Sequence, residues 1–172
     1  LARELDIGRV PVPRTPGILC AMGLLLTDLR ADFASTRLRT LGPSALPEIE
    51  QAFAALAAQS TAWFEEEGVT PEARRLTRTV DMRYAGQNYE LTIPVPDGPA
   101  TAATLDRLAE GFAAAHKQRF GFVAEGETVQ LVTFRVEAAG LVPKASFQPQ
   151  PNAGPDATDA IVDRREVWLP EA

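Results

Sequence analysis

The chain has 172 residues, of which 45% are hydrophobic and 23% charged, and its net charge at pH 7 is −6. This length and composition fit one globular domain with its own core, with or without a short appendage. The acidic balance argues against nucleic-acid binding, which needs a basic surface. The single cysteine, Cys20, excludes an internal disulfide, and the longest apolar run, residues 18–26, is too short to cross a bilayer. We therefore expect a cytoplasmic protein with no nucleic-acid or membrane partner.

The first residues show the pattern of a helix end followed by an extended segment. Residues 1–6 have the composition of the last turns of a helix, and Gly8 is a stop signal. The two prolines within residues 9–13 disfavour a central strand position. The chain begins inside one pattern and ends just after another, so we expect it to be a piece of a longer protein.

An apolar helix is predicted next. Thr15 suits the N-cap, Pro16 suits the first helical position, and the helical pattern continues to Phe33. Its leucines spread beyond one face, so we expect burial on more than one side. Cys20 is expected to be a buried, inert thiol, and Gly23 indicates close packing against a neighbour.

The middle of the chain alternates strand and helix patterns. Residues 35–41 read as a strand, and Gly68 ends the clearest helix of the sequence. The residues on one face of that helix step by three and four positions: Leu46, Ile49, Phe53, Leu56, Ser60 and Trp63.

From Arg75 the period changes to two, with Leu76, Val80, Met82 and Tyr84 on one face. The alternation resumes after Ala85-Gly86-Gln87-Asn88, which predicts a hairpin with Gly86 at positive φ in its turn. The partner strand then carries apolar residues at every second position: Tyr89, Leu91, Ile93 and Val95.

The C-terminal part contains one more helix and one long strand. Residues 101–122 form an amphipathic pattern that Gly121 ends, and residues 127–140 are apolar on both sides, as in a central strand. Residues 141–160 read as a loop or linker, and 161–169 as a last strand. The inward-facing residues of the helix are Leu105, Leu108, Phe112 and Ala115. The order of elements predicts an α+β fold, an antiparallel sheet with a central hairpin packed by two or three amphipathic helices.

Few residues in this chain could carry out catalysis. His116 is the only histidine, which excludes a multi-histidine metal site. It lies beside the apolar face of its helix, where a hydrogen-bonded structural histidine is commoner than a catalytic one. The sequence contains no phosphate-binding glycine loop, nucleophile elbow or dinucleotide fingerprint.

The hairpin carries the remaining candidates, Asp81, Arg83, Gln87 and Glu90. A pair between Arg83 and Glu90, or between Arg83 and Asp81, on an exposed sheet face would contribute only about 0.2–1 kcal/mol to stability. This structural role is one interpretation. The other is an interface, in which these groups orient the hairpin against another domain or a substrate.

Three motifs together resemble the hydantoinase A and 5-oxoprolinase family, which includes the acetone and acetophenone carboxylase subunits. They are "RVPVPRTPGILCAMGLLLTDLRADF", "DMRYAGQNYEL" and "FAAAHKQRFGF", in the family's order. Cys20 departs from the pattern, because the family usually has serine there. The resemblance implies an enzyme that couples ATP hydrolysis to opening a cyclic amide or to carboxylating a ketone.

The resemblance also implies an organisation. Residues 1–35 would be the last strand and helix of an actin-like ATPase region, and residues 36–172 a hydantoinase A C-terminal domain, truncated at its end. ATP and magnesium would bind elsewhere in the full-length protein, and no cofactor is expected on this fragment. The expected partners are the protein's own N-terminal ATPase region and a second large subunit of the hydantoinase B type. The fragment is expected to be inactive by itself.

The resemblance marks Asp81, Arg83, Gln87, Glu90 and His116 as candidates for contact with substrate or partner, and identifies no catalytic residue. Two alternatives stay open: a non-catalytic protein-interaction domain, and a subunit of an ATP-dependent ketone carboxylase. Hydantoin, oxoproline and ketone substrates are not distinguished by these residues.

Overall fold

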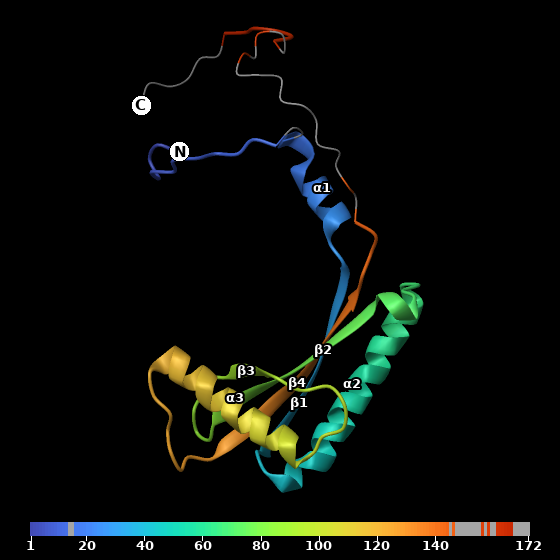
Figure 1. Ribbon diagram of the computed structural model, residues 1–172, viewed down its shortest axis with the longest axis vertical. Helices are drawn as coiled ribbons and strands as arrows, with labels where there is room; N and C mark the ends of the chain where they lie inside the picture. The colour runs from blue at the N-terminus through green and yellow to red at the C-terminus, as the bar shows by residue number, and fades with distance from the viewer. Residues whose placement is uncertain (14–15, 145, 147–155, 157, 159–160, 167–172) are drawn as a thin grey trace.

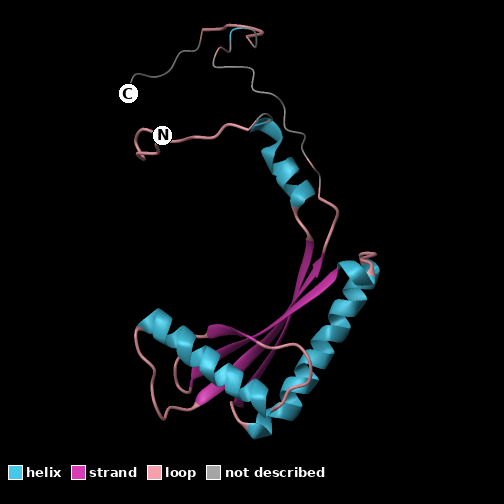
Figure 2. Cartoon of the chain, viewed as in Figure 1, coloured by secondary structure: helices cyan, strands magenta, loops and turns pink. Residues whose placement is uncertain are grey.

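The computed structural model describes residues 1–13, 16–144, 146, 156, 158 and 161–166. Its main body is a four-stranded antiparallel sheet covered by two long helices (Figures 1 and 2), which confirms the predicted α+β class. A short third helix lies apart from these layers, near the N-terminus in Figure 1.

The sheet has the strand order β1-β4-β2-β3, and every neighbouring pair is antiparallel. Its strands are β1 (Leu29–Thr40), β2 (Arg74–Tyr84), β3 (Leu91–Pro94) and β4 (Val129–Gly140). β4 lies between β1 and β2, as its apolar character on both sides predicted. β2 and β3 form the predicted hairpin, with Met82 opposite Leu91 next to the turn.

Two amphipathic helices cover one face of the sheet. α2 (Leu46–Glu66) packs over β1 and β4, and α3 (Ala102–Phe120) packs over β3. The main-chain N–H of Thr101 donates to Oγ1 of Thr104 at 3.0 Å, which helps to cap the start of α3. Gly121 ends the helix, as predicted, and it does so in the left-handed conformation with φ 87°. Three short 3₁₀ turns each begin at a proline: Pro16–Ile18, Pro43–Ala45 and Pro71–Ala73.

The core lies between the sheet and these two helices. Phe53 of α2 meets Phe134 of β4 edge to face, with ring centroids 5.5 Å apart. Phe112 of α3 contacts Tyr84 of β2 in the same way at 4.9 Å. Both helices therefore pack on the same face, and the polar residues of the strands point to the opposite face. The largest fully buried core side chains include Ile49, Leu56, Met82, Leu108, Leu131 and Val136.

The predicted helix over residues 15–33 is wrong at its C-terminal end. α1 spans Leu19–Leu26, Thr27 is already extended with φ −86° and ψ 148°, and β1 begins at Leu29. The physical reason is a change of period, because half-buried Ala31 and Phe33 alternate with exposed neighbours. The pattern over residues 29–33 has a period of two and belongs to a strand.

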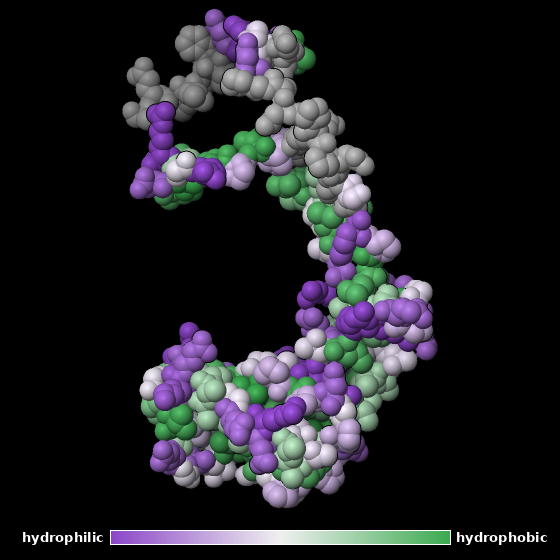
Figure 3. Space-filling model, in the orientation of Figure 1, coloured by the Kyte–Doolittle hydropathy of each residue, from purple (hydrophilic) through white to green (hydrophobic). Residues whose placement is uncertain are grey.

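The expected burial of this apolar helix is also wrong within the chain. The leucines of α1 are exposed, with Leu24 at 76% of its maximum, and hydrophobic residues reach the surface over α1 in Figure 3. Cys20 is exposed rather than buried. No atom lies within 4 Å of where a Cβ on Gly23 would be, so the predicted close contact is absent in the described residues. The described elements do not cover α1, because the sheet begins only at Leu29, after the helix has ended.

The two ends of the chain differ from the sequence predictions or lie outside the described residues. Residues 2–6 form hydrogen-bonded turns rather than a regular helix. The predicted linker at 141–160 lies mostly outside the described residues. Of the predicted strand 161–169, residues 161–166 are not in a strand, and 167–169 lie outside. No helix among the described residues is long and apolar enough to cross a membrane.

Candidate functional site

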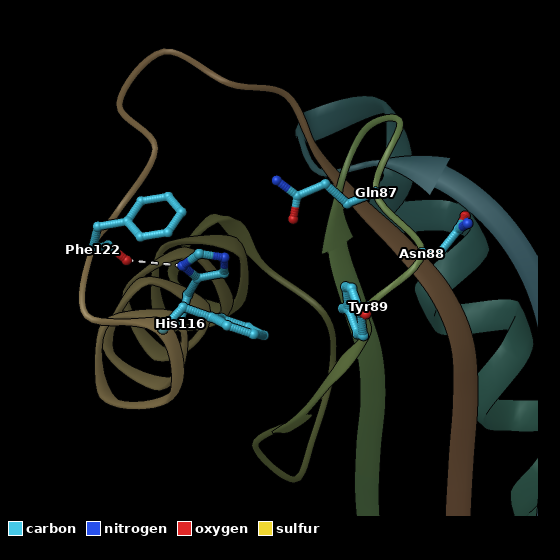
Figure 4. Close-up of a pocket in the computed structure, with 6 residues that line it drawn as sticks. Gln87, Asn88, Tyr89, His116 and Phe122 are labelled. Atoms are coloured by element: carbon cyan, nitrogen blue, oxygen red, sulfur yellow. Dashed lines mark hydrogen bonds between the residues drawn. The ribbon is translucent and has the colours of Figure 1, made fainter.

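The turn between β2 and β3 projects Gln87 away from the sheet. Gly86 has φ 81°, the left-handed conformation that glycine adopts without a steric penalty, as predicted. The main-chain N–H of Gln87 donates to the carbonyl of Tyr84 at 3.1 Å and closes the turn. Its side-chain amide makes no hydrogen bond within the described part of the chain, and it extends toward α3 in Figure 4.

Asp81 lies on the face of the sheet opposite the helices and is 5% exposed. Its Oδ2 accepts from Nε of Arg135 on β4 at 2.7 Å, and its Oδ1 accepts from the hydroxyl of Thr92 on β3 at 2.7 Å. The alternative pair between Asp81 and Arg83 is therefore not formed. Asp81 is occupied by its own neighbours, so it serves the sheet rather than an open site.

The other predicted pair is confirmed. Nη1 of Arg83 lies 3.6 Å from Oε1 of Glu90, and Nε of Arg83 donates to Oε1 of Gln130 at 3.3 Å. Both members of the pair are partly exposed, which limits its contribution to stability to about 1 kcal/mol or less. Arg83 and Glu90 thus form a polar edge of the hairpin that remains accessible.

His116 lies near the C-terminus of α3 and is 3% exposed. Its Nδ1 is 2.8 Å from the main-chain carbonyl oxygen of Phe122, so the ring is hydrogen-bonded, as expected of a structural histidine. A carbonyl can only accept, so Nδ1 must carry the proton. In the neutral ring, Nε2 is then a hydrogen-bond acceptor.

Aromatic rings hold this imidazole on several sides. Phe112, His116 and Phe120 follow each other at intervals of four along α3, so they share one face of the helix. The ring centroids of Phe120 and Tyr84 lie 4.7 and 4.9 Å from that of His116. The left-handed turn at Gly121 brings the chain back, so that Phe122 can accept the hydrogen bond from His116.

His116 and Gln87 line the same pocket, which has a volume of about 410 Å³ and opens between the hairpin turn and the end of α3 (Figure 4). The pocket is lined by Gln87, Asn88, Tyr89, His116, Phe120 and Phe122. The structure thus brings together two of the five predicted residues. Asp81, Arg83 and Glu90 do not line the pocket.

Sequence reasoning missed the aromatic walls of this pocket. Tyr89 was assigned to the apolar face of a strand, but it is 74% exposed and its ring centroid is 6.2 Å from that of Phe120. The signal in the sequence was the position of these aromatic residues. Tyr89 lies two residues after Gln87 in one motif, and Phe120 and Phe122 follow His116 in the other. An aromatic residue next to a polar residue of a motif can either pack in the core or form the wall of a pocket. Only the tertiary structure distinguishes these two arrangements.

The side chains that line the pocket offer little for catalysis. It presents one imidazole acceptor and two side-chain amides among aromatic rings, and none of its lining residues carries a carboxylate, an amine or a thiol. Within the described ranges, no group of three or more His, Cys, Asp or Glu side chains is arranged to hold a metal ion. The arrangement therefore favours recognition.

Comparison with known proteins agrees with the motifs. Residues 42–171 match the family model described as the hydantoinase/oxoprolinase C-terminal domain. An uncharacterised protein of Methanocaldococcus jannaschii is 35% identical over 148 residues, which cover 86% of this chain and 20% of that protein. The caprolactamase subunit alpha of Pseudomonas jessenii is 27% identical over 77% of this chain and 19% of its own length. The chain thus spans about a fifth of these relatives.

Two solved structures share the fold. The ATP-dependent caprolactamase of Pseudomonas jessenii superposes with a TM-score of 0.68 and 23% identity, covering 81% of this chain and 21% of that one. Nucleotide-free acetone carboxylase gives a TM-score of 0.63 and 22% identity, with the same coverage of both chains. With three motifs, a family match over most of the chain and a shared fold, the chain belongs to the hydantoinase/oxoprolinase C-terminal domain family.

Proposed function

We propose that this chain is the C-terminal domain of a subunit of an ATP-dependent enzyme that opens cyclic amides by hydrolysis. The family match over residues 42–171 carries the proposal, and the likeness to a caprolactamase subunit alpha supports the cyclic amide as substrate. Because the chain spans about a fifth of that relative, most of the enzyme's chemistry is assigned to other parts of the protein.

In this proposal the domain binds and orients rather than reacts. Gln87 and His116 share a pocket without an ionised side chain in its lining, and Arg83 with Glu90 forms an accessible polar edge nearby in the hairpin. We assign these residues to contact with the substrate or with a partner subunit. Asp81 positions the strands that carry them, because both of its oxygens bind neighbouring strands.

ATP and Mg²⁺ belong to the proposed N-terminal ATPase region, of which residues 1–35 would be the end. The name of the caprolactamase relative, a subunit alpha, supports a further subunit as partner, and we propose that this is a large subunit of the hydantoinase B type. We place the enzyme in the cytoplasm, where ATP is available.

The test uses the full-length protein with its partner subunit, ATP and Mg²⁺. ε-Caprolactam, hydantoin and 5-oxoproline are supplied one at a time, and ADP release and the ring-opened acid are measured together. We expect ADP release that depends on at least one cyclic amide, with matching product formation. ADP release only with acetone and bicarbonate would assign the protein to ketone carboxylation instead. The 172-residue chain by itself is expected to release no ADP.

A further inference from the structure

We infer that the pocket between the hairpin turn and α3 is a binding site for a small, flat, uncharged molecule that donates an N–H hydrogen bond to Nε2 of His116. The inference deepens the function proposed above and rests on it for the class of ligand, because a ring with an N–H next to a carbonyl is a cyclic amide. Binding is measured on the chain itself, whereas the enzymatic function is measured on the whole protein with ATP.

The acceptor of the site follows from the hydrogen bond on the other side of the ring. The main-chain carbonyl of Phe122 accepts a hydrogen bond from Nδ1–H of His116 at 2.8 Å, and this is the hydrogen bond that the imidazole makes within the described part of the chain. Nε2 is therefore a lone-pair acceptor without a protein partner; the residue is 3% exposed, but Nε2 is not one of its fully buried atoms and so is accessible from the pocket. Figure 4 shows this second nitrogen turned toward the side of the pocket where Gln87 and Tyr89 lie.

The composition of the walls selects an uncharged ligand. The lining consists of three aromatic rings, two amides and the imidazole, with no Asp, Glu, Lys or Arg. An ion placed among these groups would lose its hydration without gaining a counter-charge, which is costly. A molecule with a neutral N–H donor loses less hydration and can donate to Nε2, which is accessible from the pocket.

The aromatic walls and the volume select a small flat ring. Tyr89, Phe120 and Phe122 present ring faces and edges around the imidazole, and the centroids of Phe120 and Phe122 lie 4.7 and 5.0 Å from that of His116. Flat ligands gain offset or edge-to-face contacts with such rings. The volume of about 410 Å³ lies in the range of small-molecule pockets, about 300–1,000 Å³.

Gln87 supplies a second point of recognition. Its side-chain amide lines the pocket, faces His116 across it in Figure 4 and makes no hydrogen bond within the described residues. An amide can donate to a carbonyl of the ligand while Nε2 accepts from the ligand N–H. The preferred ligand is therefore a ring that carries an N–H next to a carbonyl.

A matched pair of probes tests this chemistry on the 172-residue chain. 2-Pyridone is flat and neutral and carries an N–H beside its carbonyl, whereas N-methyl-2-pyridone keeps the flat ring and the carbonyl but carries a methyl group in place of the donor hydrogen. The chain has one histidine, so the ¹⁵N signals of the ring are assigned without ambiguity. The free chain, at a mildly alkaline pH where imidazoles are neutral, is expected to show a pyrrole-like Nδ1 and a pyridine-like Nε2.

We expect 2-pyridone to shift the Nε2 signal as a hydrogen bond forms, with a dissociation constant on the order of 1 mM, typical of a ligand with few atoms. N-Methyl-2-pyridone should bind about 2–10-fold more weakly, because it offers no N–H to Nε2. Equal affinity for the two probes, a pyridine-like Nδ1, or no shift with 2-pyridone would each overturn the inference.

Variants separate the pocket from the rest of the surface. Gln87→Ala should weaken 2-pyridone binding by about 2–10-fold, the effect of one neutral hydrogen bond. Gln118→Ala, an exposed glutamine of α3 outside the pocket lining, should leave the affinity unchanged. Similar losses in both variants would contradict the assigned pocket. This comparison needs no change at buried His116, so it stays decisive if substitution there prevents folding.

Discussion

Asp81 and Arg135 join the two central strands of the sheet, with Oδ2 of Asp81 2.7 Å from Nε of Arg135. Because Thr92 donates to the other carboxylate oxygen, one side chain connects β3, β2 and β4. The Asp81 side chain is 7% exposed, whereas that of Arg135 is 50% exposed. The carboxylate is thus nearly removed from water, and Arg135 and Thr92 supply the hydrogen bonds that stabilise its charge. Asp81 therefore has a structural role in the hairpin.

Asp81→Asn should lower the free energy of unfolding by about 1–3 kcal/mol, because a charge-assisted hydrogen bond is lost. The amide keeps one acceptor oxygen, so its NH2 group must face either the hydroxyl of Thr92 or the guanidinium of Arg135. Chemical denaturation measures the change. The control is Glu137→Gln, which removes the exposed pair of Glu137 with Arg30 and should cost less than about 1 kcal/mol. Equal costs would contradict the buried role of Asp81.

Gly121→Ala should destabilise the chain by about 1–2 kcal/mol, since φ at this position is 87° and a Cβ disfavours the left-handed conformation. The same substitution should also loosen the hydrogen bond from His116 to Phe122, visible as a mixture of ring tautomers in ¹⁵N spectra. Gly42→Ala is the matched control, because its φ of 165° is ordinary extended backbone and its Cβ would meet open space. A loss of stability at Gly42 as large as at Gly121 would refute this explanation.

Gly140→Ala should be destabilising for a different reason, overpacking. A Cβ there would come within 2.7 Å of one methyl of Val69 and 3.2 Å of the other. We expect a loss of about 1–3 kcal/mol in a denaturation experiment. Val69→Ala removes both methyl groups, so the double variant should be more stable than the sum of the two single changes predicts. Simple additivity would show that the clash is not the cause.

The pH dependence of stability should carry a contribution from Asp28. Its pKa lies below the ordinary value because the Lys144 side chain and the main-chain N–H of Val142 donate to its carboxylate. A carboxyl whose pKa is lowered on folding stabilises the fold above its unfolded pKa, and this contribution disappears as pH falls through the folded pKa. The stability difference between the native chain and Asp28→Asn should therefore shrink as pH is lowered from about 5 to 2. A difference independent of pH would exclude this linkage.

In the full-length protein, Arg83→Ala and Gln87→Ala should lower amide-dependent ADP release several-fold without unfolding the domain. Both side chains lie on the accessible part of the hairpin, and their loss removes few core contacts. Arg107→Ala and Gln118→Ala, two exposed positions of α3, are the matched controls and should retain full activity. Unchanged turnover in Arg83→Ala and Gln87→Ala, at unchanged melting temperature, would restrict the hairpin to a structural role.

Local patterns predicted most of the main body. The stepping of apolar residues by three and four in α2, the alternation around Val80 and Met82, and the glycines at 86 and 121 each correspond to an observed helix, strand or turn. They were predictable because side-chain direction follows backbone period over short distances. The start of β1 was missed because the apolar run of α1 passes into the strand without a glycine or proline between them, and only the change of period at Leu29 marks the boundary.

For the site, the motifs identified Gln87 and His116 but not their relationship. The sequence by itself determined the helices and strands, the hairpin turn and the polar groups available. The tertiary structure decided that Asp81 pairs with Arg135, that the carbonyl of Phe122 orients His116, and that Tyr89 faces a pocket rather than the core. The physical reason is distance along the chain. Period and turn chemistry act over a few residues, whereas these contacts join segments that only the packing of α3 and the strand order bring together.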